Sequence, residues 1–575
     1  CTAARNQQIL PVPTSTSTLP PTIALHPVSR PSTTTMTDLL PVPAVDVCNV
    51  PITSPLGRLR MAMKNTSYTQ MNAFFDAFLI FFSDEHLSEE PQEDERRLEY
   101  NSGWDGVGTG VVMDNYSALW VPAGEMQRAR AVVPCPWTIV DQDDPSQPTI
   151  AEWISDKLRR NGRVGGDARL TSVGEWGSLH ASLHSVGLTL ISMPTLLDQL
   201  WADEPDLNRR RPEFSRIVAQ LHHTDYTGLS WREKVLLVRN ELTANGADAM
   251  VVTALDEVAW LLNVRGKDTP HAPLLKAFVF VSLKEVRVYA PPGKLSMPVR
   301  EALAVYNCFN TNNNCTKVID YANIYADLRR TTESKVLIPI AGTFQRGASA
   351  AISQAVPLGK RLFLPSPIIY LKAQKNEAEI KGMKRAHLKD AVAMCTLLNY
   401  LENIGKSGLT EISVVTKVDA TRATQAGFNG KSMVTRVAFG PNAAIPDYRP
   451  TNVTNRRIFS NSTLIIQSGG QYVEGTTIVT RTLQYGVPSK EIRRAYTTVL
   501  RSLAAMATLQ IPATLPAAHT DPVARAPLWI AKQDYLHPTG YGVGAALNRR
   551  EDPVVIDYRQ DTNLHTFREG YFITS

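Results

Sequence analysis

The segment 464–486, LIIQSGGQYVEGTTIVTRTLQYG, is predicted to form a β-hairpin that presents two side chains at fixed points. Those points are Gln467 and Ile478, eleven residues apart. Glutamine offers only a neutral amide and isoleucine offers no donor atom, so the pair is a poor one for acid–base or nucleophilic chemistry. The sequence therefore raises the question whether this hairpin held chemistry that the chain no longer performs.

The hairpin belongs to a series of motifs between residues 251 and 553. They are VVTALDEVAWLLNVRGKD at 251–268, KNEAEIKGMKRAHLKDAVAMC at 375–395, GPNAAIPDY at 440–448, SGGQYVEGTTIVTRT at 468–482 and LHPTGYGVGAALNRREDP at 536–553. In this order they resemble the Xaa-Pro aminopeptidases, the aminopeptidase P family, and the likeness runs from about residue 57 to the end of the chain. An ordered series is far more specific than any single motif.

The resemblance implies both a fold and a chemistry. The fold is α/β, with two related α/β N-terminal domains followed by a pita-bread (creatinase/aminopeptidase-like) C-terminal domain, commonly assembled as a homo-dimer. The family removes an N-terminal residue that precedes proline, and it uses two divalent metals, manganese or zinc, to activate a bridging water. Two cations at close range repel each other, so such a site needs several anionic oxygens, completed by an imidazole.

The family's five metal ligands are two aspartates on the hairpin, one histidine in the Gly-rich motif and two glutamates near the C-terminus. Carried over, the aspartates fall at Gln467 and Ile478, and the histidine falls at Tyr541. Both glutamates would lie beyond Ser575, because EGYFITS resembles the strand that leads to the first of them. Each lost anionic ligand weakens divalent-ion binding strongly. We therefore predict no metal cofactor, no dinuclear site and no peptidase activity.

Other residues near the implied active site give the same prediction. His537 keeps the place of a histidine thought to shuttle a proton in the family, whereas Asp447 and Arg550 replace two further histidines. Without a metal-bound water, His537 is expected to be a hydrogen-bonded pocket residue, so none of the three is expected to be catalytic. Turn glycines such as Gly469 and Gly540 are kept, which favours a folded pseudoenzyme over a decayed chain.

Three functions stay open on the sequence. The first is a secreted, catalytically silent relative that acts as a binding or structural protein, with a peptide ligand in a surviving pocket or through self-association. The second is an active metalloaminopeptidase that releases the residue before proline through a non-standard metal site, such as one ion on Asp447, His537 and Glu551, although their spacing does not show that they converge. The third is a subunit of a carbohydrate- or matrix-associated polymer, which the family's dimerisation permits.

Composition and periodicity divide the chain into four parts. Residues 1–55 form a Pro/Ser/Thr-rich leader, too poor in large apolar residues to pack a core. Residues 56–220 and 221–368 alternate apolar runs with helical patterns, as α/β domains do, and the resemblance makes them the two creatinase-like domains. Residues 369–575 open with a predicted helix over 376–405 and form the pita-bread domain, C-terminally incomplete.

Charge and hydrophobicity exclude two classes of partner. The chain has 60 Lys+Arg and 54 Asp+Glu, a net charge of +6 that is small for 575 residues, and its densest basic run is NRRR at 208–211. We therefore expect no nucleic-acid binding. The longest apolar stretch, 71–82, is short and contains Asp76, so no transmembrane segment is predicted. A membrane anchor in a C-terminal tail stays open.

Secretion through an oxidising route is predicted from the chain start, the glycosylation acceptors and the cysteines. The chain begins at Cys1 and not at Met, as after removal of a signal peptide. N-linked glycans are expected at five Asn-x-Ser/Thr acceptors, more than chance would give. These are Asn65, Asn115, Asn314, Asn452 and Asn461. Disulfides are expected between Cys308 and Cys315 and between Cys1 and Cys48, whereas Cys395 is expected to be a small core residue.

Overall fold

The computed structural model describes residues 48–65, 74–158, 161–305, 316–403, 408–459, 462–560 and 564–575. Several predicted features lie outside these ranges. They are the leader up to residue 47, Cys1, Cys308, Cys315, Asn314 and Asn461. Residues Val50–Ser575 make up one structural unit, which contains almost all of the described chain.

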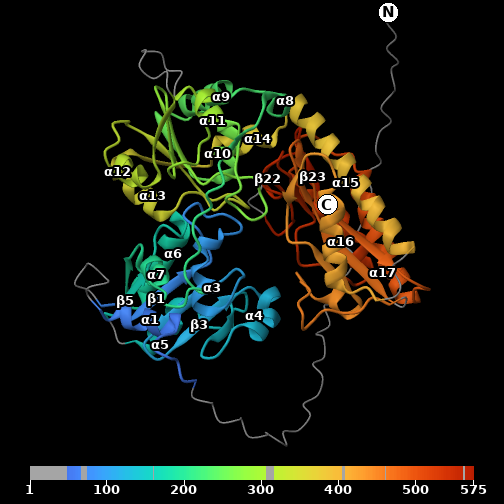
Figure 1. The fold of residues 1–575 in the computed structure, drawn as a ribbon, viewed down its shortest axis with the longest axis horizontal. Helices are drawn as coiled ribbons and strands as arrows, with labels where there is room; N and C mark the ends of the chain where they lie inside the picture. Colours follow the sequence, from blue (N-terminus) through green and yellow to red (C-terminus); the bar gives the residue numbers. More distant parts are fainter. Residues whose placement is uncertain are drawn as a thin grey trace, which may run out of the picture. The chain divides into compact units, whose positions relative to one another are not determined.

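A six-stranded mixed sheet organises the first domain, with the strand order β4-β3-β2-β1-β5-β6 (Figure 1). Its strands are β1 (Ala77–Phe81), β2 (Thr109–Met113), β3 (Ser117–Val121), β4 (Thr138–Asp141), β5 (Arg163–Gly166) and β6 (Thr189–Ser192). Every residue of the apolar run AFLIF in β1 is buried, as a strand covered on both faces requires. Leu79 packs in the cluster on one face, with Trp120, and Phe78 packs in the cluster on the other, with Trp104.

Short helices flank this first sheet. They are α1 (Pro55–Met63), α3 (Arg97–Ser102), α4 (Met126–Val132), α5 (Ile150–Lys157), α6 (Val173–Ser185) and α7 (Leu196–Ala202). Capping boxes fix the starts of two of them. Thr149 begins α5 and Ser172 begins α6, and in each case a glutamate three residues later bonds back to the cap.

The sheet of the second domain has the same topology as that of the first, with the strand order β12-β11-β10-β8-β13-β14. Its strands are β8 (Ala249–Val252), β10 (Phe278–Ser282), β11 (Val286–Ala290), β12 (Thr316–Asp320), β13 (Val336–Pro339) and β14 (Arg361–Leu364). Along both sheets the successive pairings are parallel, antiparallel, antiparallel, parallel and parallel. The prediction of two related α/β domains is confirmed.

Helices of the second domain begin where the sequence signals them. The predicted cap Ser230 begins α9 (Trp231–Ala244) through a capping box with Glu233. Shorter helices are α10 (Leu255–Leu262), α11 (Met297–Ala302), α12 (Ile324–Arg329), α13 (Ala350–Ala355) and α14 (Pro367–Ala373). The cores of α9 and α10 pack together with β8 in one cluster that includes Val235, Val258 and Met250.

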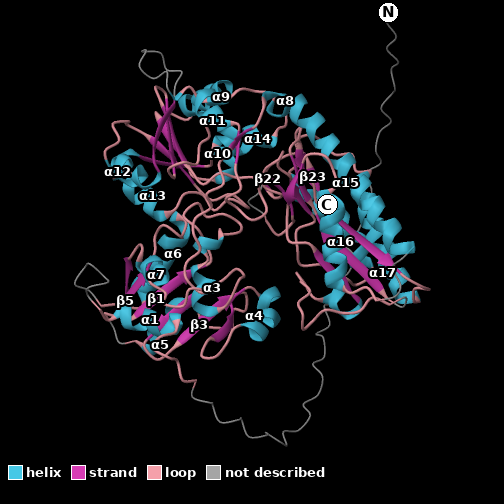
Figure 2. Ribbon diagram, viewed as in Figure 1, coloured by secondary structure: helices cyan, strands magenta, loops and turns pink. Residues whose placement is uncertain are grey.

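The C-terminal domain combines four helices with three small sheets (Figure 2). The helices are α15 (Glu377–Asn403), α16 (Glu411–Ala423), α17 (Lys490–Ala507) and α18 (Asp521–Ile530). The sheets are β15-β18-β19, β16-β17-β20 and β22-β21-β23. Their strands are β15 (Phe428–Lys431), β16 (Arg436–Phe439), β17 (Thr463–Ser468), β18 (Gly470–Tyr472), β19 (Gly475–Thr476), β20 (Val479–Gln484), β21 (Gly540–Gly542), β22 (Glu551–Ile556) and β23 (Ile573–Thr574). The predicted helix over 376–405 is α15.

The predicted hairpin over 464–486 is interrupted. Strands β17 and β20 pair antiparallel, with Ser468 opposite Val479 and Gln467 opposite Thr480. Between them the chain leaves this sheet and forms β18 and β19, which join β15 in another sheet. Gly469 is required where the chain leaves, because a Cβ there would lie 2.1 Å from the Thr477 carbonyl oxygen.

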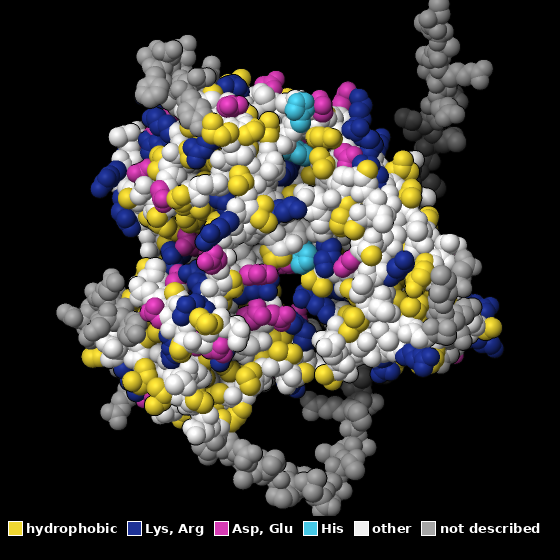
Figure 3. Space-filling model, viewed as in Figure 1, with side chains coloured by type: hydrophobic (Ala, Val, Ile, Leu, Met, Phe, Trp, Pro, Cys, Tyr) yellow, Lys and Arg dark blue, Asp and Glu magenta, His cyan; other side chains and the backbone are white. Residues whose placement is uncertain are grey.

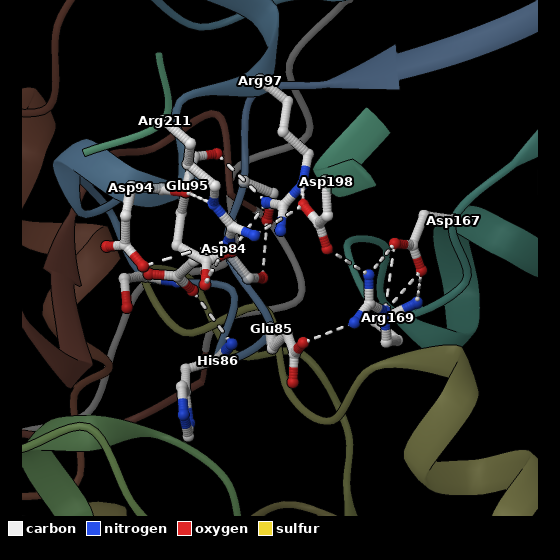
Figure 4. Close-up of polar contacts among 12 residues, drawn as sticks. Asp84, Glu85, His86, Asp94, Glu95, Arg97, Asp167, Arg169, Asp198 and Arg211 are labelled. Carbon is white, nitrogen blue, oxygen red and sulfur yellow. Dashed lines mark hydrogen bonds and ion pairs between the residues drawn. The ribbon is translucent and has the colours of Figure 1, made fainter. Parts of the chain in front are cut away.

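Buried ion pairs concentrate in the first domain around Arg97 and Arg169 (Figure 4). Arg97 donates to Glu95 and to Asp198, both at 2.6 Å, and Arg169 donates to Glu85 at 2.8 Å. Lys276 of the second domain also pairs with Glu95. Charges this deeply buried are tolerated only when they are paired, so the network fixes the contact between the first two domains.

His86 extends this contact as a neutral residue. Its ring stacks on Phe278 at a centroid separation of 4.1 Å, and its Nδ1 lies 2.8 Å from the Thr253 carbonyl oxygen. Burial lowers the pKa of His86 to about 3, so the ring is uncharged near neutral pH and its Nδ1–H donates to Thr253.

Two further predictions can be compared with the described chain. None of its helices has the length and hydrophobicity to span a membrane. Cys395 is exposed on α15, so the prediction of a core cysteine is wrong: its apolar neighbours Met394 and Leu397 occupy the buried face of the helix instead. Cys48 is disulfide-bonded, and so is Cys135, for which no disulfide was predicted.

Candidate functional site

Gln467 contacts a guanidinium group. It is the residue before the last of β17 and lies opposite Arg436 of β16, whose Nη1 donates to the Gln467 amide oxygen at 3.3 Å. The same Arg436 nitrogen pairs with Asp447, whose side chain is 55% exposed. Asp447 itself has a φ of 52°, in the left-handed region that aspartate tolerates better than most residues. One arginine therefore links Gln467, predicted to occupy a former metal-ligand position, with Asp447, a predicted relic of the active site.

Ile478 is a packing residue. It lies between β19 and β20, is half-buried, and packs against Met383, Val543 and Ala545. Phe572 packs against the same three residues. This small apolar cluster joins α15 to the Gly-rich motif, so Ile478 contributes to stability through burial.

Tyr541 occupies the position at which the resemblance places a metal-binding histidine, and its ring contacts an aromatic ring and a guanidinium group. It lies on β21, and its ring meets that of Phe344 edge-on, at a centroid separation of 5.6 Å and an interplanar angle of 70°. The guanidinium carbon of Arg550 lies 5.4 Å from the centroid of the Tyr541 ring. Tyr541 and Arg550 are thus brought together, as a cation–π pair.

The residues at these three positions do not fit two divalent ions. They supply an amide, a hydrocarbon and a phenol, whereas a dinuclear site needs several anionic oxygens. The amide oxygen of Gln467 already accepts from Arg436, whose positive charge opposes a second cation. Nowhere in the described ranges do three or more His, Cys, Asp or Glu side chains form a group that could hold a metal ion. No reaction step can be drawn through these positions.

The single-ion alternative on Asp447, His537 and Glu551 is not assembled either. Glu551 is buried, with one carboxylate oxygen 2.9 Å from the Lys372 ammonium and the other paired with Lys375. Burial alone would raise the pKa of Glu551, but these two ammonium groups hold it below its usual value.

His537 is exposed, and the prediction of a pocket residue is wrong. Its ring stacks on Tyr535 at 4.6 Å, and its Nδ1 lies 2.9 Å from the Pro538 carbonyl oxygen. The histidine lies in the loop that follows α18, and within the described ranges its ring nitrogen bonds to the Pro538 carbonyl oxygen, whereas Asp447 pairs with Arg436 and Arg550 with Glu89.

A cavity of about 70 Å³ is lined by residues of all three domains. Its charged wall is made by Glu89, Glu90, His271, Arg549 and Arg550. Arg549 lies 2.7 Å and Arg550 3.2 Å from the same Glu89 oxygen, and His271 pairs with Glu90. The face drawn in Figure 3 is hollowed near its centre, and acidic and basic side chains gather around that hollow.

The carboxylate of Glu90 is held in its charged form. Burial alone would raise its pKa, but the hydrogen bond from His271 and the charges of Arg549 and Arg449 together lower it. Sequence reasoning missed Glu89, Glu90 and His271, because His271 is 181 residues from Glu90 and Arg549 is 460 residues from Glu89. The only available signal was the NRRED run, in which Arg549 adjoins Arg550.

Family models match nearly the whole described chain. Two models of the creatinase/prolidase N-terminal domain match residues 70–200 and 210–379. The model of metallopeptidase family M24 matches residues 381–575.

Individual relatives extend over most of the chain. Aminopeptidase P2 of Arabidopsis thaliana is 31% identical, covering 88% of this chain and 74% of that protein. Xaa-Pro aminopeptidase 1 of Dictyostelium discoideum is 32% identical, covering 92% and 82%. An X-prolyl aminopeptidase of Caenorhabditis elegans, described as a cytosolic enzyme with a di-nuclear active site, superposes with a TM-score of 0.78 at 28% identity, over 90% and 82% of the two chains.

These relatives confirm the predicted fold, two creatinase-type domains before a pita-bread domain. They contradict two other predictions. The expectation that the protein is not an enzyme is wrong, because the relatives are aminopeptidases. The expectation of no metal cofactor is wrong as well, because family M24 and the di-nuclear structure imply metal.

Replacing Ile478 with aspartate should destabilise the protein. The carboxylate would enter the apolar cluster of Met383, Val543 and Ala545, at a cost on the order of several kcal/mol. Thermal unfolding in the presence of a chelator measures the effect. Val487→Asp, at a position 91% exposed, is the matched control and should leave the melting temperature unchanged. A melting temperature for Ile478→Asp equal to the wild type would show that the cluster is open and hydrated.

Proposed function

Because this chain belongs to the Xaa-Pro aminopeptidase family, we propose that it is an enzyme that acts on peptides with proline in the second position. The observation that carries the proposal is identity of 32% over 84–92% of the chain with relatives named Xaa-Pro aminopeptidase. The proposal concerns the substrate class, and it draws no support from Gln467, Ile478 or Tyr541.

A groove of suitable size supports a peptide substrate. It measures about 410 Å³ and is lined from the first domain by Asp94, from the second by 267–273 and from the third by Gln471 and 429–431. This volume lies within the range of about 300–1,000 Å³ that small-ligand sites occupy. The backbone 269–272 also lines the 70 Å³ cavity, so the two spaces share a wall.

Peptide hydrolysis tests the proposed substrate class directly. We expect release of alanine from Ala-Pro-Ala, and little from Ala-Ala-Ala, in buffer containing Mn²⁺ or Zn²⁺. Chromatography of the products, with a chelated sample as the control, measures the reaction. Intact Ala-Pro-Ala under every metal condition would overturn the proposal.

We also propose that the protein is a secreted glycoprotein. Of the predicted acceptors, Asn65, Asn115 and Asn452 lie within the described chain, and all three are exposed outside regular elements. The disulfide bonds of Cys48 and Cys135 favour an oxidising compartment.

Mass spectrometry of native protein tests the glycan prediction. We expect mass at Asn115 and Asn452 that an N-glycosidase removes, because both side chains are exposed. Asn115→Gln should remove one glycan without lowering stability. Finding all of the acceptors bare in native material would contradict secretion through a glycosylating route.

Self-association is a further proposal, supported by helix α17. Its apolar side chains Tyr496, Val499, Leu500 and Leu503 are each about half exposed, and in this helix only Thr498 and Ser502 are buried. An exposed apolar stripe of this kind is typical of an interface, and a second copy of the chain is the partner that the dimerising family suggests.

Sedimentation velocity tests this interface. The wild type should sediment as a dimer or larger species, and Leu500→Glu should shift it toward the monomer. Arg494→Glu, at an exposed position about 120° around the same helix from Leu500, is the control for added negative charge. Equal sedimentation of wild type and Leu500→Glu would remove α17 from the interface.

A further inference from the structure

A groove of about 580 Å³ lies between α17 and α18 in the C-terminal domain. Its α17 wall carries four cations, called here the basic stripe, which are Lys490, Arg493, Arg494 and Arg501. Its α18 wall is apolar and includes Ile530. Within the described part of the chain no carboxylate lines the groove, so the groove is positively charged.

The helix period explains why these four cations share one wall. Relative to Lys490, the three arginines stand at i+3, i+4 and i+11, positions that fall on one side of an α-helix. At a rise of about 1.5 Å per residue, the basic stripe is ~16 Å long. The one acidic residue of α17, Glu491, does not line the groove. With four basic side chains against one acidic, this helix alone supplies half of the chain's net charge of +6.

No partner neutralises the basic stripe in the described structure. All four side chains are exposed, and none of them has a hydrogen bond or an ion pair there. This differs from exposed pairs such as Lys64 with Asp114 and Arg216 with Glu213. Like charges three and four residues apart on a helix repel each other and destabilise it. The basic stripe is therefore a set of donors that a bound anion would stabilise.

We propose that this groove binds a sulfated polysaccharide chain. Such a chain carries anionic oxygens at repeated spacing along its length, and guanidinium groups bind oxygens of this kind through paired N–H donors. The C–H faces of its sugar rings would pack against the apolar wall at Ile530.

Two other polyanions fit the groove less well. The bases of a single-stranded nucleic acid stack on aromatic side chains, and no aromatic residue lines the groove in the described ranges. A membrane surface is flat, so it would not follow a groove. The inference goes beyond the proposed peptidase activity, because no residue that lines this groove lines the 70 Å³ cavity or the 410 Å³ groove.

Calorimetric titration of the full chain with a heparin hexasaccharide tests the proposal. We expect the wild type to bind it, and to bind more weakly as the salt concentration rises. Arg494→Gln/Arg501→Gln should weaken binding about tenfold or more, because two charged hydrogen bonds are lost. Lys384→Gln/Arg385→Gln, at two exposed positions of α15, removes the same charge outside the groove and should leave the affinity unchanged.

Two further probes distinguish the class of ligand. A hexasaccharide without sulfate should not bind, and equal binding with and without sulfate would overturn the proposal. Vesicles of phosphatidylserine and phosphatidylcholine test a membrane instead. Binding of the vesicles without binding of the hexasaccharide would also overturn it.

The variants need a check that they are folded. Circular dichroism and sedimentation velocity without probe show whether fold and self-association are kept, and Leu500 lies on another side of α17 from Arg494. If Arg494→Gln/Arg501→Gln is not folded, Lys490→Gln/Arg493→Gln, nearer the start of α17, carries the test. No hexasaccharide binding by the wild type, or wild-type affinity in a folded variant of the basic stripe, contradicts the proposal.

Discussion

The buried pairing of two lysines with Glu551 is the interaction on which the rest of the site depends. Lys372, at the end of α14, lies 2.9 Å from Glu551 and 3.0 Å from Asp256 of α10, and Lys375 holds the other Glu551 oxygen. Burial lowers the pKa of Lys372, but Asp256 and Glu551 more than reverse this and keep it charged. Removing one partner from such an arrangement typically costs about 3–5 kcal/mol. Because Glu551 begins β22, the same pairing positions Arg549, Arg550 and, through β21, Tyr541.

Backbone contacts around the site hold the Gly-rich motif and the turn at Gly469 in place. Arg265 of the second domain donates to the carbonyl oxygens of Ala545 and Ala546, at 3.3 and 2.7 Å, and so secures the Gly-rich motif. Gly469 keeps the close backbone approach that the turn requires. Within this frame, the guanidinium group of Arg436 donates to the amide oxygen of Gln467.

Sequence alone predicts the local elements of this fold well and the contacts between them poorly. The amphipathic period gave α15 to within two residues at its C-terminal end, and Ser230 marked the start of α9. The β18–β19 excursion was missed because its partner, β15, lies some forty residues upstream. Cys395 was misplaced because neighbouring apolar residues do not reveal which face of a helix is covered. The charged wall of the cavity was missed because its residues are far apart in the sequence, 181 positions for Glu90 and His271 and 460 for Glu89 and Arg549.

That separation along the chain also governs when the cavity can form. The contact between Glu89 and Arg549 closes a loop of 460 residues, and synthesis proceeds from the N-terminus. The first two domains, each built around its own sheet, can therefore acquire their structure on the ribosome while Glu89 and Glu90 still lack their arginine partners. Bringing such distant segments together costs conformational entropy before their contacts stabilise the fold, so these contacts form late and slowly. During this interval the growing chain exposes the side of Glu89 that Arg549 later covers.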